Sequence, residues 1–287
     1  MAISQSHTLG EFIGAFFEDM MKKPICEFAD SNGLYFDTGG PRKTRRGNKL
    51  TWADVNGSKH NLDFVLEKGG TDESIGEPIA FIELAWRRYT KHSKNKVQEI
   101  AGALNPIFEK YRLNNPFKGA ILSGQFTENS INQLKNDNFH VLYIPFDILV
   151  RAFRKYGFDI DFGEDTKETD LRKKFAAVSN KKSKPILKKV REEILKTCRK
   201  DIDQFVAELK TSYNRKIKTI CILPLHGKCT EVINIEKAID FINGYNKIPV
   251  DINLEYIEII VNYNNGSSIK GQFKEKDDVL IFLNSLK

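Results

Sequence analysis

The chain has 287 residues, 40% of them hydrophobic and 11% aromatic, a composition that excludes a disordered tail, a collagen-like fibre and a disulfide-stapled miniprotein. Its 45 basic and 38 acidic residues give a formal net charge of +7, which favours anionic partners without proving one. No apolar run reaches the ~18 residues that cross a bilayer, and the first residues lack the basic start of a secretory signal. We therefore expect a globular cytoplasmic protein with no membrane partner.

Hydrophobic spacing predicts alternating strands and helices over the first 166 residues. A first helix covers residues 8–23 and is expected to end at Pro24. Asn56-Gly57 is typical of a tight hairpin turn. The other predicted elements are strands at 33–38, 49–55, 60–67 and 79–86, a helix at 93–111, a strand at 119–125, a helix at 130–136, a strand at 141–144 and a helix at 148–156. This order predicts an α/β fold, a mixed central β-sheet flanked by helices, in which the very apolar strand 79–86 is central.

An acidic, polar stretch at residues 163–169 marks the predicted domain boundary, so we assign a first domain to 1–166 and a C-terminal region to 167–287. Apolar positions at helical spacing predict one long basic helix over 184–212. A second α/β unit follows, with strands at 218–225, 254–263 and 268–273 and helices at 235–243 and 276–286. The four scattered cysteines are typical of reduced thiols, and a zinc cluster of Cys221, His226 and Cys229 is a minor alternative.

Positive charge is concentrated in three tracts. Residues 41–50 hold five basic side chains and no acid, residues 86–96 hold another five without an acid, and residues 172–200 hold twelve against two acids. A nucleic-acid phosphate backbone is the natural counter-surface, although a solvated face is the alternative for any single tract. The predicted DNA contacts are Arg42, Arg45, Arg46, Arg87, Arg88 and Lys96.

Two acids, Asp63 and Glu83, sit inside otherwise apolar predicted strands, where a bare carboxylate is unfavourable without a charged partner. If the two strands pair antiparallel, both carboxylates lie near one end of the sheet, where oxygen ligands suit Mg²⁺. An acid pair, a metal and a basic rim are what phosphodiester hydrolysis requires. The inert alternatives are that Asp63 merely caps or pairs with Arg87 and that Glu83 forms a buried ion pair with Lys94.

Asp63, a strand bearing Glu83, and a following helix that opens with Lys and Gln together resemble the PD-(D/E)xK nuclease superfamily, which includes many type II restriction endonucleases. The resemblance covers residues 8–162 in element order. It implies that Asp63 and Glu83 bind Mg²⁺, that the backbone carbonyl of Leu84 joins them, and that Glu18 on the first helix is a further candidate ligand. The family places a catalytic Lys two residues after the Glu, and that position is Ala85 here.

Members of the superfamily carry such a Lys on the neighbouring helix in some cases, so the resemblance implies a replacement among Lys91, Lys94 and Lys96. At 100° per residue, Lys94 and Gln98 fall at the edge of the inward face and Lys96 points roughly opposite. The helical phase therefore predicts Lys94 as the catalytic cation with Gln98 beside it. An irregular first turn makes Lys91 equally good.

These expectations combine into a Mg²⁺-dependent endonuclease of double-stranded DNA, of the restriction or host-defence type. Cutting both strands needs two active sites, so a homodimer is expected. The C-terminal region is expected to serve DNA recognition or subunit contact, and a cognate DNA methyltransferase is a further candidate partner. The alternatives are a non-catalytic DNA-binding protein on a degenerate nuclease scaffold, for which Ala85 is the main argument, and an RNA or modified-DNA substrate.

Overall fold

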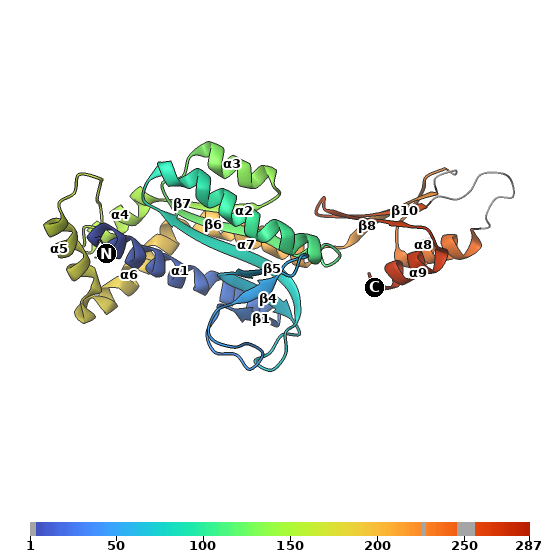
Figure 1. Cartoon of the computed structure of the whole chain (residues 1–287), viewed down its shortest axis with the longest axis horizontal. Coiled ribbons are helices and arrows are strands. Elements are labelled where there is room, and N and C mark those ends of the chain that lie inside the picture. The colour runs from blue at the N-terminus through green and yellow to red at the C-terminus, as the bar shows by residue number, and fades with distance from the viewer. Residues whose placement is uncertain (1–3, 225–227, 246–255) are drawn as a thin grey trace. The chain divides into compact units, whose positions relative to one another are not determined.

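The protein was analysed as a computed structural model, which describes residues 4–224, 228–245 and 256–287. The chain forms two compact units, Met1–Lys210 and Thr211–Lys287 (Figure 1). The first unit extends past the predicted boundary at residue 166, because the helices that follow it pack on the first domain. Helix α5 (Glu168–Ser179) contacts α1 (Gln5–Ser31), and α6 (Lys184–Thr197) contacts α4 (Phe146–Lys155).

A mixed five-stranded sheet in the order β1-β4-β5-β6-β7 forms the centre of the first unit. Its strands are β1 (Leu34–Asp37), β4 (Phe64–Lys68), β5 (Glu77–Arg87), β6 (Phe117–Gly124) and β7 (His140–Pro145). Strand β5 pairs antiparallel with β4 and parallel with β6. The prediction of a mixed sheet with its apolar strand in the middle is therefore confirmed.

Helices cover both faces of this sheet (Figure 1). Helix α2 (Ser93–Lys110) buries Val97 and Leu104 in a core with Phe81 and Ala85 of β5, and α3 (Glu128–Asn136) adds Leu134. On the other face, α1 contacts β1 and β5, and Phe205 of α7 (Arg199–Tyr213) packs edge-on against Phe117 of β6. A short 3₁₀ turn, η1 (Thr90–His92), connects β5 to α2.

Helix α1 is longer than predicted. It begins at Gln5, where the Ser4 hydroxyl accepts a hydrogen bond from the main-chain N–H of His7, and it runs through Pro24 to Ser31. A proline inside a helix removes one main-chain hydrogen bond. The helix nevertheless continues because its second half buries a further apolar face, which includes Ile25 and Phe28. The prediction that Pro24 ends it is wrong.

The predicted hairpin forms, but it is a separate two-stranded sheet of β2 (Thr51–Ala53) and β3 (Lys59–Asn61). Asp54 stabilises the turn, because its Oδ1 accepts hydrogen bonds from the main-chain N–H groups of Asn56 and Ser58, and Gly57 takes the left-handed conformation at φ 83°. The predicted strand 60–67 is therefore interrupted, and Asp63 lies in the bend before β4 instead of within a strand.

The single basic helix predicted at 184–212 is two helices, α6 and α7, which meet at Cys198. The 3₁₀ turn η2 (Lys181–Ser183) precedes them. Buried positions such as Ile194, Cys198 and Ile202 keep helical spacing across the break, so periodicity alone does not reveal it. Within the described residues, no helix has the length and apolarity that would let it span a membrane.

The second unit is an antiparallel sheet in the order β11-β10-β8-β9, with α8 (Ile235–Gly244) and α9 (Lys276–Asn284) in the same core. Its strands are β8 (Ile217–Pro224), β9 (Thr230–Val232), β10 (Ile257–Tyr263) and β11 (Ser268–Phe273). The predicted α/β unit is confirmed, except that β9 is too short to be read from periodicity. Residues 225, 254 and 255 of the predicted strands lie outside the described part of the chain.

Candidate active site

The candidate site lies at the start of β4, where the neighbouring strand β5 extends past the end of β4. Among the described residues, the pairing of β4 with β5 starts at Phe64 and Ile82, so the next part of β5 extends past its neighbour. Asp63 caps this edge, because its Oδ2 accepts a hydrogen bond from the main-chain N–H of Leu84 at 2.7 Å. The antiparallel register therefore places Asp63 beside Glu83, as the sequence predicts.

Glu83 is a buried acid with an incomplete set of partners. It is 8% exposed, and within the described residues its Oε1 is buried without a hydrogen-bond partner. Burial, followed by the charge of Asp63, raises the pKa of Glu83 from 4.5 to about 8, while Lys96 opposes the rise. A buried carboxylate oxygen without a hydrogen-bond partner is rare in proteins, and such groups are often found at binding or catalytic sites.

Asp63 and Glu18 complete the acidic part of the site. Burial is the main cause that raises the pKa of Asp63, the Leu84 N–H group lowers it, and the nearby charge of Glu18 raises it again. Glu18 comes from α1 and forms an i,i+4 ion pair with Lys22 at 3.6 Å. The structure thus brings the acid predicted on the first helix into the electrostatic field of Asp63, although Glu18 itself remains partly exposed.

Lys96 is the cation that the structure places beside the two buried acids. Its side chain is 14% exposed, its charge lowers the pKa of both Asp63 and Glu83, and its Nζ lies 2.7 Å from Oε1 of Glu99. Glu99 is itself mostly exposed, so this pair is a weak anchor.

The predicted order of the lysines is reversed, because Lys94 and Gln98 are exposed on α2. The buried face of α2 includes Ser93, Ile100 and Ile107. At 100° per residue Lys96 lies about 70° from the centre of that face on one side and Lys94 about 90° on the other. The two lysines therefore occupy opposite edges of the face, and the edge with Lys96 is the one directed at the acids.

A cleft of about 570 Å³ opens beside these groups. One wall is the N-terminal half of α1. The other wall is the C-terminal end of β5 with Tyr89 and Phe162. Asp63, Glu18, Leu84 and Lys96 line it. The other residues along the two walls are Trp86, Arg87, Arg88, Ser4, Ser6, His7, Gly10, Glu11, Gly14, Phe17 and Ala85.

Three of the predicted DNA contacts, Arg87, Arg88 and Lys96, line this cleft. Arg88 stands over the Phe146 ring at 4.4 Å and lies 3.5 Å from Asp161. Lys91 lies on the 3₁₀ turn η1, before α2 begins at Ser93, and it pairs with Glu164 at the surface. The helix therefore begins where the choice of Lys94 over Lys91 assumes.

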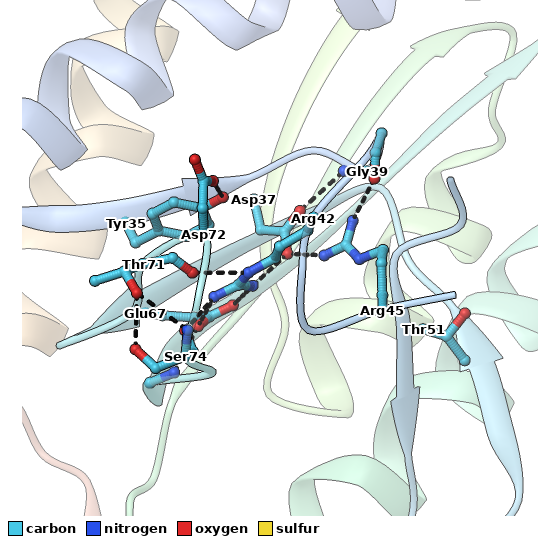
Figure 2. A network of polar contacts seen from close by, with 12 residues as sticks. Tyr35, Asp37, Gly39, Arg42, Arg45, Thr51, Glu67, Thr71, Asp72 and Ser74 are labelled. Atoms are coloured by element: carbon cyan, nitrogen blue, oxygen red, sulfur yellow. Dashed lines mark hydrogen bonds and ion pairs between the residues drawn. The ribbon is translucent and has the colours of Figure 1, made fainter. Parts of the chain in front are cut away.

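Arg42, predicted to contact DNA, is buried in an ion-pair network (Figure 2). Its guanidinium donates to Asp37 at 2.7 Å, to both oxygens of Glu67 at 2.7 and 2.9 Å, and to the carbonyls of Thr71 and Ser74. All five of its N–H groups are thereby used, and pairing with Glu67 raises the pKa of Arg42 above its ordinary value. The prediction of a DNA contact at Arg42 is therefore wrong.

Arg45 joins the same network by pairing with Asp37, and its side chain is mostly buried, which also removes it from the predicted basic surface. Arg46 is exposed and remains free to meet a polyanion. The basic tract 41–50 thus has a mainly structural role, because it fastens the loop after β1 onto β4. The sequence signal was present in the acids Asp37 and Glu67, which need a cation once they are buried.

Replacing Arg42 with Met is expected to lower the free energy of unfolding by about 3–5 kcal/mol, because it leaves buried carboxylates without their cation. Asp37 and Glu67 are 3% and 0% exposed, so water cannot replace the lost pairing. Arg46→Met on the same loop is the control and should change stability by less than about 0.5 kcal/mol. Urea denaturation measures both variants, and equal effects would contradict the network.

The acids suit a divalent cation by chemistry, and the unpartnered Oε1 of Glu83 is the observation that supports this fit. Throughout residues 4–224, 228–245 and 256–287, no group of three or more His, Cys, Asp or Glu side chains is arranged to hold a metal. A site here would therefore rest on Asp63, Glu83 and the main chain at Leu84. For the alternative zinc cluster, His226 lies outside the described residues, whereas Cys221 and Cys229 interact with each other.

Comparison with known proteins does not assign this site. No protein-family model matches the chain, and no curated protein matches it. Among solved structures, the chain is similar to the crystal structure of AF1548, a protein of unknown function, with 14% identity and a TM-score of 0.31 over 69% of this chain and 97% of that one. A likeness at this level carries no argument about fold family or function.

Proposed function

We propose that the protein is a Mg²⁺-dependent nuclease of the PD-(D/E)xK type that hydrolyses DNA phosphodiester bonds. The observation that carries the proposal is the pair formed by buried Glu83 and half-buried Asp63 where β5 extends past β4, with an unpartnered Glu83 oxygen and the Lys96 cation beside it. Buried acids that repel each other reduce stability, so a site that retains them is a functional candidate.

The roles follow from position. Asp63, Glu83 and the main chain at Leu84 would hold the ion, and a bound Mg²⁺ would supply charge neutralisation at the phosphate and a lower pKa for the attacking water. Lys96 orients that water and offsets the negative charge that develops on the phosphate oxygens. Arg87 and Arg88, which line the same cleft, bind flanking phosphates of the strand.

Lys96 also supports the catalytic proposal over the non-catalytic alternative. The family position for the Lys is Ala85, which is 3% exposed and packs in the core against α2. Lys96 brings an ammonium group to the acids from that same helix, so the charge set is acid, acid and cation despite Ala85. A restriction or host-defence role, a homodimer and a methyltransferase partner remain predictions of the resemblance.

Purified protein is expected to nick or linearise plasmid DNA with Mg²⁺ and to leave it intact with EDTA. Asp63→Asn keeps an oxygen that can accept from the Leu84 N–H but removes the charge, so it should lower the rate by about 10²-fold or more. Agarose gels and melting curves check activity and folding together. DNA binding without cleavage by the wild-type chain would favour the non-catalytic scaffold, and equal cleavage by Asp63→Asn would remove the proposal.

A further inference from the structure

We infer that the cleft beside the acids receives an unpaired DNA strand, so that the preferred substrate is single-stranded DNA or an unpaired segment of a duplex. This inference rests on the proposed nuclease function and adds the form of the nucleic acid to it. Three features of the described first unit support it: the depth of the acids, the size of the cleft, and the chemistry of its walls.

The acids are recessed. Glu83 is 8% exposed, and half-buried Asp63 lines the cleft together with Glu18 of α1 and Lys96 of α2. A phosphate on the surface of a rigid double helix approaches such a group only if the cleft is wide enough for the duplex to enter. A single strand has no such restriction, because its backbone bends into the cleft and its bases are free to turn outward.

The cleft is small for a duplex. A volume of about 570 Å³ falls within the ~300–1,000 Å³ range of small-ligand sites, which suits one or two nucleotides. The size therefore favours an unpaired segment at the acids.

The walls combine aromatic rings with guanidinium groups. Trp86 lies against Gly10 and Gly14 of α1, its ring is 5.2 Å from the Phe146 ring, and the residue lines the cleft. Tyr89 is half-buried farther along, and the Arg88 guanidinium lies 5.3 Å from its ring. Rings that stack on bases, with cations that follow the backbone, are the usual means of binding unpaired nucleic acid without sequence preference.

Binding can be measured without cleavage, because the chain has two tryptophans, Trp52 and Trp86. In a Trp52→Phe variant the remaining indole is the one in the cleft, and Trp52 itself is a core residue whose replacement keeps an aromatic ring. Titration with oligothymidylate in EDTA is expected to quench this fluorescence. The affinity should be at least ~10-fold higher than for a blunt duplex of equal length.

Tyr89→Leu in the same background should weaken binding of the single strand by about 5- to 10-fold, since one stacking ring is lost. Tyr156→Leu, a half-buried tyrosine at the end of α4, is the matched control and should leave the affinity unchanged. In Mg²⁺, an end-labelled single strand should be cut at least ~10-fold faster than the interior of its duplex.

The outcomes separate the two proposals. Equal binding and equal cleavage of single strand and duplex would overturn the preference for unpaired DNA and leave the nuclease function standing. Quenching by the single strand without cleavage of any DNA in Mg²⁺ would overturn the nuclease function and support the cleft as a binding site. A loss of affinity in Tyr156→Leu equal to that in Tyr89→Leu would count against stacking at Tyr89.

Discussion

Replacing Glu83 with Gln is expected to lower Mg²⁺-dependent DNA cleavage by about 10³-fold while the protein stays folded. The substitution keeps the shape of the side chain and removes the charge that would hold the ion. It also removes the repulsion between two buried acids, so the metal-free variant should be at least as stable as the parent. Loss of activity with equal or higher stability is the signature of a residue retained for function.

The pH dependence of stability gives a second readout for the same variant. The pKa of Glu83 in the folded protein is raised from 4.5 to about 8, so the folded state keeps a proton that the unfolded state releases at a lower pH. The resulting stability is present below about pH 4.5 and is lost as the pH rises through about 8. In the absence of metal, the melting temperature of Glu83→Gln should therefore exceed that of the parent by an amount that grows as the pH is raised toward about 8.

Glu77→Gln is the matched control, since it changes an exposed Glu at the start of the same strand, β5. It should leave both the cleavage rate and the pH profile close to those of the parent. The assay is the initial rate of plasmid nicking, with melting followed by circular dichroism. Retention of more than about a tenth of the activity by Glu83→Gln would show that the ion, if one is used, is held elsewhere.

Replacing Lys96 with Met is expected to lower the cleavage rate by about 10²-fold, because it removes a cation whose charge acts on both acids. Lys94→Met, two residues away on the exposed face of α2, should stay within about 2-fold of the parent. The methionine keeps the apolar stem of the lysine, so packing changes little in either variant.

Initial rates over a range of DNA concentrations separate the chemical step from binding. Loss of Lys96 should lower kcat more than it raises KM, whereas a residue that merely contacts the DNA backbone changes KM and the salt dependence. Lys96→Arg should recover part of the rate because it restores the charge. Equal rates for the two methionine variants would show that Lys96 has no catalytic role and only forms an ion pair with Glu99.

Much of the first unit was predictable because its signals are local. Asn56-Gly57 determines a hairpin turn, and the apolar run at residues 78–82 of β5 favours burial on both faces. The proximity of Asp63 and Glu83 was equally accessible, since the antiparallel pairing of β4 with β5 brings the residue just before β4 next to Glu83. In each case the residues that determine the structure lie within one turn, one strand or two successive strands.

The boundaries of the helices were less predictable, because packing between distant elements decides them. The α1 helix continues through Pro24, since buried side chains such as Phe28 compensate for the missing hydrogen bond. The break at Cys198 leaves no trace in the spacing of apolar residues. The first unit likewise reaches Lys210, because α5 and α6 pack on helices that precede the predicted boundary.

By itself the sequence determined the mixed sheet, the central strand and the two acids that meet on it, because burial of apolar side chains and strand register act over short distances. Only the tertiary structure decided that Lys96 and not Lys94 approaches those acids, since both flank the buried face of α2 and the packing angle selects one edge. It also decided that Arg42 binds Asp37 and Glu67 inside the protein instead of a polyanion outside. The sequence shows that a charged side chain needs a partner of opposite charge when it is buried, and only the fold determines which charged group lies close enough to be that partner.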